Sequence, residues 1–405
     1  QTLATRRIKQ SNYRGVEPKL KMYNYKPYLT KRPNKLWAIS IAIATLISAF
    51  GLSYAFRRQQ KTAANHLCVG VILPLTGNSA YIGQSIKNGM DIAGTDVNKN
   101  LSLQLEYSDT GGEVARVVTA YQSLVNVKKC QSIIAVQEGV KALIPLAAKD
   151  QRVLLATSVP DNGITGKNPW VFRFFVSAES DAGTMAEYAV NQLKKRKAAI
   201  IYVNNSTGIS YRDSFAQKFS QLGGNIIETQ AFNPNDIDFR TQALKIKLAA
   251  PDAVYIVGYG KSIANIPIQL REAGVTATFL SMGTISQPEI LQAAGEAANG
   301  LYYTTAEFAT DLNAGTSELK QFVDAYRSRF GTNPVFFEFF GYDSLRLLLL
   351  AAERGGTEPE KLRQGLENLA NVPLAVGNVS VGKDGNVEFP IVVRKIVDGK
   401  WTTPE

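Results

Sequence analysis

Residues 68–98, CVGVILPLTGNSAYIGQSIKNGMDIAGTDVN, join three patterns that together decide the fold. A short and almost wholly apolar run comes first, then a loop rich in Gly, Ser, Thr and Asn, then a stretch with the apolar spacing of a helix. We interpret these as a buried β-strand, a loop and an α-helix. In an open α/β sheet, ligands bind at loops that leave the carboxyl end of a strand and open a helix. This loop is therefore a candidate binding element.

The same alternation of apolar runs and helical patterns continues to about residue 306. Runs such as AAIIYV, 198–203, and AVYIV, 253–257, are typical of strands that are buried on both faces. Strands that alternate with helices indicate βαβ units and a parallel sheet. The number of units exceeds one compact sheet, and a second cycle begins at Lys197, so we expect two similar α/β lobes. Near the end of the chain, a β-hairpin is expected around Asp384 and Gly385.

The net positive charge of the chain comes from its first 61 residues. These carry 13 of the 45 Lys and Arg residues but only one of the 34 acidic residues, which leaves 32 basic and 33 acidic residues for the rest. A domain that binds nucleic acid needs basic residues on its folded part. We therefore expect no nucleic-acid partner.

An apolar segment lies within this basic region. Residues 37–56 contain no charged side chain and are long enough for a helix to span the hydrocarbon core of a bilayer. Ten basic residues precede the segment and three follow it by residue 61, which places the amino terminus in the cytoplasm and the main domain outside. We interpret the segment as an uncleaved transmembrane anchor in the lipid bilayer. A cleaved signal peptide is the alternative.

Residues 1–36 form a basic, aromatic-rich tail without apolar periodicity. Attraction to anionic lipid head groups is one explanation of this cytoplasmic tail, and docking of a cytoplasmic partner is the other. Residues 57–65 form a short polar linker to the main domain. The expected product is a single-pass membrane protein whose main domain is periplasmic or extracellular.

Several segments of the main domain resemble, in the right order, the type I periplasmic binding proteins of branched-chain amino-acid and amide ABC transporters. They include GVILPLTGNSAYIGQSIKNGMDIA (70–93), WVFRFFVSAESDAGTMAEYA (170–189), FNPNDIDFRTQALKIKLAAPDAVYIVGYG (232–260) and FFEFFGYDSLRLLLLAAERGG (336–356). The resemblance covers about residues 66–403. It implies two Rossmann-like lobes, joined by three crossings, that close on a ligand by a hinge motion. It also implies a binding protein, not an enzyme, and no cofactor.

The resemblance divides the main domain between the two lobes. Lobe 1 would comprise residues 66–177 and 307–375, and lobe 2 would comprise residues 178–306 and 376–405.

In this family, hydroxyls, backbone amides and an acid hold the amino-acid ligand. The matching positions here are Ser79, Tyr81, Gln137, Glu138, Ser158, Val159, Thr207, Gly208, Tyr259 and Thr284. Tyr81 would be a stacking wall, and Tyr259 matches the family pattern. Other positions depart from the pattern: an acid at Glu138 would repel a carboxylate, and Pro160 replaces a threonine and lacks a backbone donor. The resemblance therefore implies the scaffold with an atypical ligand site.

Cys68 lies at the start of the first expected strand, and Cys130 lies just before the third. In a lobe with the strand order 2-1-3, as the resemblance implies, these strands are neighbours. Their ends would then lie close enough for a disulfide, which an extracytoplasmic location permits. Two separate buried thiols are the alternative. No metal site is expected, since His66 is the only histidine.

Two functions from different classes follow. The first is a membrane-tethered solute-binding protein that closes on a small polar ligand, amino-acid-like or amide-like, for an ABC-transporter permease or for a signalling or assembly partner. The second is a structural or regulatory subunit that uses the fold as a protein-docking module. The altered anchors favour the second function, whereas the opening loop and Tyr259 favour the first. An aspartic protease is not expected from DTG at 109–111, because that chemistry needs two such carboxylates.

Overall fold

The computed structural model describes residues 66–77, 79–136, 139–307, 316–387 and 389–404, together with Ser48. The folded part belongs to one compact unit, residues 60–405. The predicted tail (1–36), the linker (57–65) and, apart from Ser48, the predicted anchor (37–56) lie outside the described residues. Within the described ranges, no helix has both the length and the apolar character that crossing a membrane requires.

The first lobe is built on a parallel sheet with the strand order β2-β1-β3-β4-β5. The predicted order 2-1-3 is confirmed. Strands β3 to β5 are buried at every position, as the mainly apolar sequences of β3 and β4 predict; β5 is buried although it contains Arg173. The strands are β1 (His66–Leu73), β2 (Ser102–Asp109), β3 (Ser132–Val136), β4 (Val153–Thr157) and β5 (Val171–Phe174).

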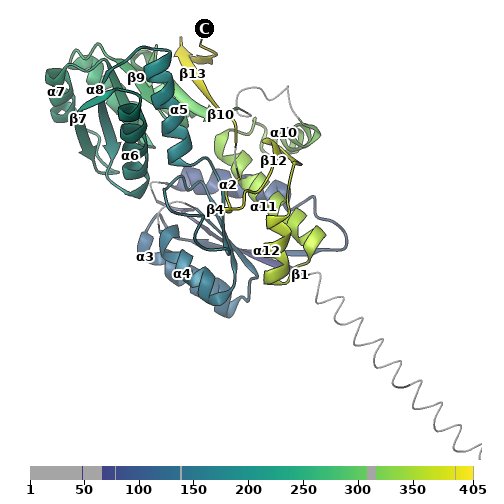
Figure 1. The fold of residues 1–405 in the computed structure, drawn as a ribbon. Helices are drawn as coiled ribbons and strands as arrows, with labels where there is room; N and C mark the ends of the chain where they lie inside the picture. Colours follow the sequence, from purple (N-terminus) through teal and green to yellow (C-terminus); the bar gives the residue numbers. More distant parts are fainter. Residues whose placement is uncertain are drawn as a thin grey trace, which may run out of the picture. The chain divides into compact units, whose positions relative to one another are not determined.

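Helices from two distant parts of the chain pack in this lobe. The second and later set, coloured yellow-green in Figure 1, returns from the other lobe and packs beside α2. The helices are α2 (Ala80–Ala93), α3 (Val114–Gln122) with a π-helical extension η1 (Ser123–Val127), α4 (Val140–Asp150), α10 (Ser317–Phe330), α11 (Phe336–Gly355) and α12 (Pro359–Glu367); a small ribbon of β11 (Val372–Leu374) and β12 (Gly377–Val379) follows.

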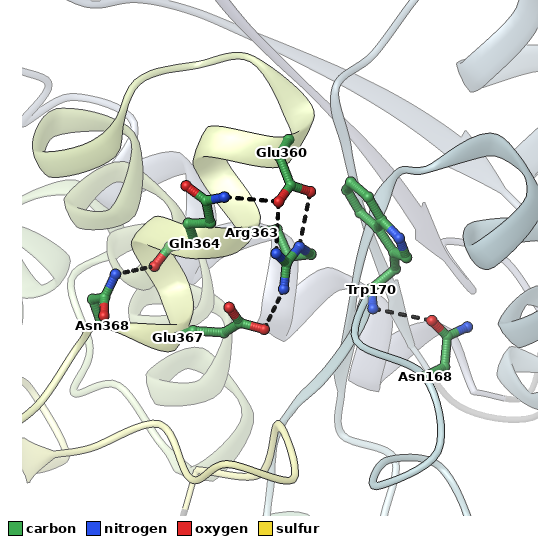
Figure 2. Close-up of polar contacts among 7 residues, drawn as sticks. All are labelled: Asn168, Trp170, Glu360, Arg363, Gln364, Glu367 and Asn368. Carbon is green, nitrogen blue, oxygen red and sulfur yellow. Dashed lines mark hydrogen bonds and ion pairs between the residues drawn. The ribbon is translucent and has the colours of Figure 1, made fainter.

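Helix α12 packs on the lobe through the buried Leu362 and Leu366, and Arg363, shown in Figure 2, adds a contact at its surface. The guanidinium of Arg363 forms ion pairs with Glu360, at 2.6 Å, and with Glu367, both on the same helix. It also lies over the ring of Trp170, 5.6 Å from the ring centroid. Trp170 directly precedes β5, so this contact joins α12 to the edge of the sheet.

The second lobe repeats the plan with a larger sheet, in the order β14-β13-β10-β9-β8-β6-β7. The five strands β6 to β10 are parallel, and β13 and β14 add an antiparallel edge. Its elements are α5 (Ala178–Asn191), β6 (Lys197–Val203), α6 (Ser206–Gln221), β7 (Asn225–Phe232), α7 (Arg240–Ala249), β8 (Ala253–Val257), α8 (Lys261–Glu272), β9 (Thr278–Ser281), the 3₁₀ turn η2 (Gly283–Ser286), α9 (Pro288–Ala294), the 3₁₀ turn η3 (Gly295–Ala298), β10 (Tyr302–Ala306), β13 (Ile391–Val397) and β14 (Lys400–Thr402).

Each lobe has its own hydrophobic core, and the last crossing between the cores comes later than predicted. Residues 376–387 were expected in the second lobe, but Val379, Val381 and Val387 are buried in the core of the first. The reason is the free edge of β5: the backbone of Arg173 exchanges hydrogen bonds with Gly385 and Val387, which covers that edge.

The expected hairpin at Asp384 and Gly385 is only a tight turn closed by one bridge, between Val381 and Val387. The true hairpin of this region joins β13 to β14 through Asp398 and Gly399, both with positive φ, of 50° and 70°. An Asp-Gly pair with two positive φ angles is the favoured two-residue turn.

The two cysteines form a disulfide, with the Cα atoms of Cys68 and Cys130 4.5 Å apart. Hydrogen bonds between Cys68 and Gln131 hold the two segments together at the same place. The bond lies at the amino-terminal side of the sheet, as the strand order predicts, and therefore away from the loops that follow the strands.

Candidate functional site

The loops that leave the carboxyl ends of the strands in the two lobes meet around a small cavity of about 40 Å³. The wall carries four hydroxyl groups among apolar side chains, and no charged side chain of the described residues lines it. The lining residues are Ile82, Ser158, Pro160, Phe175 and Phe337 from the first lobe and Thr207, Tyr259, Met282 and Thr284 from the second.

A larger and more polar vestibule of about 490 Å³ adjoins Tyr259, which borders both spaces. Its first-lobe wall contains Ser79 and the Thr110–Gly111–Gly112 turn. Its second-lobe wall contains residues 234–237 and the start of α8. The inner cavity and the vestibule together form the candidate site, which we call the cleft.

The opening loop is held in place by an acid of the neighbouring strand. The Asp109 carboxylate accepts hydrogen bonds from the N–H groups of Leu75 (2.7 Å), Thr76 (3.2 Å) and Gly111 (2.8 Å), and from the Thr76 hydroxyl (2.7 Å). Partial burial opposes the charge, but the bonds from Thr76, Gly111 and Leu75 outweigh it and lower the pKa of Asp109. The carboxylate thus shapes the loop.

The loop brings Ser79 to the cleft and Tyr81 to the boundary between the lobes. Ser79 lines the vestibule at the start of α2. The ring of Tyr81 meets the ring of Phe337 edge-on, with centroids 6.2 Å apart. Burial raises the pKa of Tyr81 to about 12, and the backbone of Gly260 in the second lobe lies beside its hydroxyl. Tyr81 therefore lies between the two lobes but lines neither the inner cavity nor the vestibule, and its role as a stacking wall stays a prediction.

The predicted residues after β3 and β4 divide into three outcomes. Gln137 and Glu138 lie outside the described residues. Ser158 lines the inner cavity and has a φ of 56°, a left-handed conformation that costs a non-glycine residue about 1–2 kcal/mol. The side chain of Val159 is 2% exposed, packs in the core of the first lobe and lines neither part of the cleft, so its predicted place in the ligand site is not supported by its side chain.

The predicted residues of the second lobe come together, but their polar groups already have partners. The Thr207 hydroxyl donates to the carboxylate of Asp161 at 2.7 Å, and the Thr284 hydroxyl donates to the Gly258 carbonyl at 2.7 Å. The N–H of Gly208 donates to the Asn205 side chain, which caps α6.

Gly208 has a packing role that the sequence analysis did not foresee. A Cβ there would lie 1.8 Å from the carbonyl oxygen of Val203, so only glycine lets α6 begin this close to β6.

Tyr259 is placed by the topology of the second sheet. The strand order reverses between β6 and β8, and the loops after these two strands carry Asn205 and Tyr259. The Asn205 amide donates to the Tyr259 hydroxyl at 2.6 Å, which fixes the ring between the inner cavity and the vestibule.

Sequence reasoning missed the residues that join the two lobes. Asp161 and Asn162 follow β4 and contact the first turns of α6: Asp161 accepts from Thr207, and Asn162 donates to Ser210 and Ser214, both at 3.1 Å. The available signal was an acid-amide pair directly after a buried strand. The apolar wall of Ile82, Phe175, Met282 and Phe337 carried no signal, because core side chains have the same composition.

Most of this chain is similar to known binding proteins. A protein of Brucella melitensis described as "Leu/Ile/Val-binding protein homolog 3" is 24% identical over 382 residues, which are 89% of this chain and 97% of that protein. The crystal structure of a leucine-binding protein, LivK, from Thermotoga maritima is 26% identical, with a TM-score of 0.76 over 84% of this chain and 98% of that one.

A third match is a solute-binding protein of an ABC transporter from R. palustris, solved in complex with benzoate. Its TM-score is 0.74 at 19% identity, over 83% of this chain and 95% of that one, and this likeness shows the fold. The first relatives are binding proteins, not enzymes. Residues 67–400 match the family described as "Periplasmic binding protein", and the chain belongs to that family.

Proposed function

We propose that this protein is an extracytoplasmic solute-binding protein that captures a small molecule for the permease of an ABC transporter. One observation carries the proposal: the wall of the inner cavity combines Ser158 and Phe337 of the first lobe with Tyr259 of the second. A ligand held there would contact both lobes at once. It would therefore stabilise the closed arrangement of the lobes over an open one.

The wall favours a ligand with an apolar body and few polar groups. A free amino acid would bury its ammonium group without an acidic partner on this wall, which costs at least about 1–3 kcal/mol. Ile82, Phe175, Met282 and Phe337 suit an aliphatic or aromatic body. The Ser158 hydroxyl and the polar vestibule suit a carboxylate or amide head.

The proposal includes closure. A cavity of about 40 Å³ is far smaller than the 300–1,000 Å³ or so that ligand sites of this kind usually offer. A ligand of the proposed size can enter only if the lobes separate, and the lobes would then settle around it. The Ser158 backbone, held at a costly positive φ in the wall, supports a functional role for this loop.

Membrane tethering is the finer part of the proposal and rests on the sequence alone. Residues 37–56 are apolar and uncharged, and the basic residues before them place the main domain outside the cytoplasm. A tethered binding protein would stay close to its permease. The basic tail, 1–36, leaves a signalling or assembly partner as the alternative recipient of the closure.

A protein-docking subunit without a small ligand is the second candidate. It is favoured by the engaged hydroxyl groups of Thr207 and Thr284 and by the small inner cavity. In that case the contacts between the lobes would be permanent, and no solute would change them.

A thermal-shift screen of the purified protein separates the two functions. The library would contain branched and aromatic carboxylates, their amides, and amino acids. A ligand at one hundred times its dissociation constant should stabilise the folded protein by about 2.7 kcal/mol. A library without any effect on the folded protein would contradict the solute-binding proposal and support the docking subunit.

A matched pair of variants locates any ligand that is found. Tyr259→Ala removes the side chain shared by the inner cavity and the vestibule and should abolish most of the stabilisation. Tyr302→Ala makes the same change in the same lobe, at a half-buried tyrosine that packs against Tyr188, and should leave the shift intact. Equal shifts in both variants would place the ligand outside the cleft.

A further inference from the structure

A second cavity, separate from the cleft, lies where the second lobe meets the start of helix α11. Its volume is about 930 Å³, which is in the range of sites for ligands of drug size. It shares no lining residue with the inner cavity or the vestibule. We call it the hinge cavity, because it borders β10 and the residues before α11, where the chain returns to the first lobe.

The wall of the hinge cavity is largely aromatic and apolar. Tyr303 on β10, Phe336 and Phe339 on α11, Leu291 on α9 and Trp401 on β14 line it. Trp401 is 43% exposed, which makes it one of the few large apolar side chains at the surface of the described residues. Aromatic side chains that surround an open space of this size are suited to a flat ring system.

One buried polar group in this wall has no partner. Gln287 is only 5% exposed, and its amide nitrogen makes no hydrogen bond among the described residues. A buried donor without an acceptor costs about 1–3 kcal/mol, so such groups call for an explanation. This nitrogen has almost no accessible surface, so an acceptor on a molecule in the hinge cavity would remove the cost only after the amide group turns toward the cavity.

Neighbouring residues from both lobes separate the hinge cavity from the cleft. In the turn η2 and the residue after it, Thr284 lines the inner cavity, whereas Ser286 and Gln287 line the hinge cavity. On α11, Phe337 lines the inner cavity and its neighbour Phe336 lines the hinge cavity. A molecule in the hinge cavity would therefore press on the wall of the cleft without entering it.

We propose that the hinge cavity is a second ligand site, for a flat aromatic molecule that carries one hydrogen-bond acceptor. The Gln287 amide turns toward the cavity and donates to the acceptor, and the ring packs among Tyr303, Phe336 and Trp401. The lining holds two acids, Glu296 and Asp398, and one base, Lys400, so its net charge does not favour an anion, and a preference for the acceptor has to come from Gln287. The site is independent of the function proposed for the cleft.

Isothermal titration of the full chain with two soluble probes tests this assignment. Naphthalene-2-sulfonate has the ring system and an acceptor head, whereas naphthalen-2-ylmethylammonium has the same ring and only donors. We expect the sulfonate to bind with a stoichiometry of one, and at least about fivefold more tightly than the ammonium, as one hydrogen bond is worth. Absence of binding, as would follow if the chain's own residues filled the cavity, would overturn the proposal.

Two neighbouring positions on α9 provide a blocking variant and its control. Gln292 is exposed and lines the hinge cavity, so Gln292→Trp should fill the space and weaken sulfonate binding at least tenfold. Ala293 is equally exposed but does not line it, so Ala293→Trp should change binding less than twofold. Equal binding to both variants would place the probe elsewhere and overturn the assignment.

Gln287→Met tests the role of the amide. Methionine has a similar length and no donor, so the variant should lose the preference for the sulfonate over the ammonium while both probes still bind. If the preference persists in this variant, Gln287 does not recognise the acceptor. Thermal unfolding of Gln287→Met should show no loss of stability beyond that of Ala293→Trp, which separates recognition from damage to the fold.

Discussion

At the scale of single residues, Asp343 of α11 is a carboxyl group that is completely buried in the first lobe. Its oxygens accept the N–H groups of Ala375 (2.9 Å) and Val376 (2.8 Å), which fixes the turn between β11 and β12. Removal from water disfavours the charge more than these bonds favour it, and it raises the pKa of Asp343 to about 7.

This residue should make the stability of the protein depend on pH. A carboxyl group with a raised pKa binds its proton more tightly in the folded state, so unfolding releases that proton between about pH 4 and pH 7. The stabilisation is complete below about pH 4 and is lost as the pH rises to 7. The loss amounts to roughly 4 kcal/mol at most, from a pKa difference of about three at 1.36 kcal/mol each.

Urea unfolding at several pH values between 4 and 8 checks this prediction. Asp343→Asn cannot titrate, so its free energy of unfolding should fall less steeply than that of the wild type over this range. Asp324→Asn is the control: Asp324 is exposed, and its pKa is lowered by a hydrogen bond from Lys320. Parallel pH profiles for the wild type and Asp343→Asn would show that Asp343 is ionised throughout.

The sequence predicted which residues approach the cleft better than what their polar groups do there. Ser158, Thr207, Tyr259 and Thr284 line the inner cavity as the resemblance implied. The bond that engages Thr207 comes from Asp161, 46 positions earlier in the chain, and no local pattern encodes such a partner. Side-chain pairing between lobes depends on how the lobes meet, which sequence periodicity does not specify.

At the scale of elements, the contact between α2 and α11 depends on two glycines that face the backbone of the other helix. A Cβ added to Gly89 would lie 2.0 Å from the carbonyl oxygen of Glu338, and one added to Gly341 would lie 2.0 Å from that of Ile86. No side chain can move aside to relieve either clash, because the opposing atoms belong to the backbone. The two helices therefore pack at a distance that only glycine permits.

The same substitution should have opposite effects in two helices. Gly341→Ala forces α2 and α11 apart and should destabilise the protein by about 1–3 kcal/mol or more, as overpacking does. Gly183→Ala, inside α5, meets no atom within 4 Å and should stabilise it by about 0.5–1 kcal/mol through helix propensity. Denaturant unfolding of both variants checks this, and a neutral Gly341→Ala would show that the helices can separate without cost.

The disulfide contributes at the same scale by joining β1 to the start of β3. It closes a loop across a sequence separation of 62, for which the loss of chain entropy in the unfolded state corresponds to about 4 kcal/mol. The double variant Cys68→Ala/Cys130→Ala should therefore unfold at lower urea concentration. Two single-tryptophan variants can report on the lobes separately, one that retains Trp170 in the first lobe and one that retains Trp401 in the second. Loss of the disulfide should lower the urea concentration at the midpoint of unfolding more when Trp170 reports than when Trp401 reports. A larger shift at Trp401 would contradict this assignment.

Sequence patterns predicted the elements well wherever each lobe repeats a βαβ unit. Continuous apolar runs identified β3, β4, β6 and β8, and the order 2-1-3 located the disulfide. The end of the chain was less well predicted. The position of residues 376–387 is determined by hydrogen bonds to the free edge of β5, which their own periodicity does not indicate. Two Asp-Gly pairs compete for the hairpin there, and only strand pairing with β10 selects the second.

At the scale of the whole molecule, polar contacts between the loop after β4 and the start of α6 join the two lobes. The Asp161 carboxylate is 4% exposed and accepts the Thr207 hydroxyl, while Asn162 donates to Ser210 and Ser214. Arg173 of β5 holds this loop in place, because its guanidinium donates to the carbonyl oxygens of Pro160 (3.3 Å) and Asp161 (3.0 Å). The loop is thus braced in the first lobe and attached to the second.

Thr207→Val should loosen the closed arrangement. The variant keeps the shape of the side chain but leaves the buried Asp161 carboxylate without this donor, at a cost of about 1–3 kcal/mol. Opening of the lobes lets water reach the carboxylate and removes that cost, so the open arrangement gains population. Hydrogen–deuterium exchange should accelerate roughly 5- to 150-fold in residues 158–165 and 204–211, the fold-change that corresponds to this free energy. The control is Thr241→Val, on the exposed face of α7, which should leave the exchange rates of both segments unchanged. If Thr207→Val also leaves these rates unchanged, the lobes are held together by their apolar contacts alone.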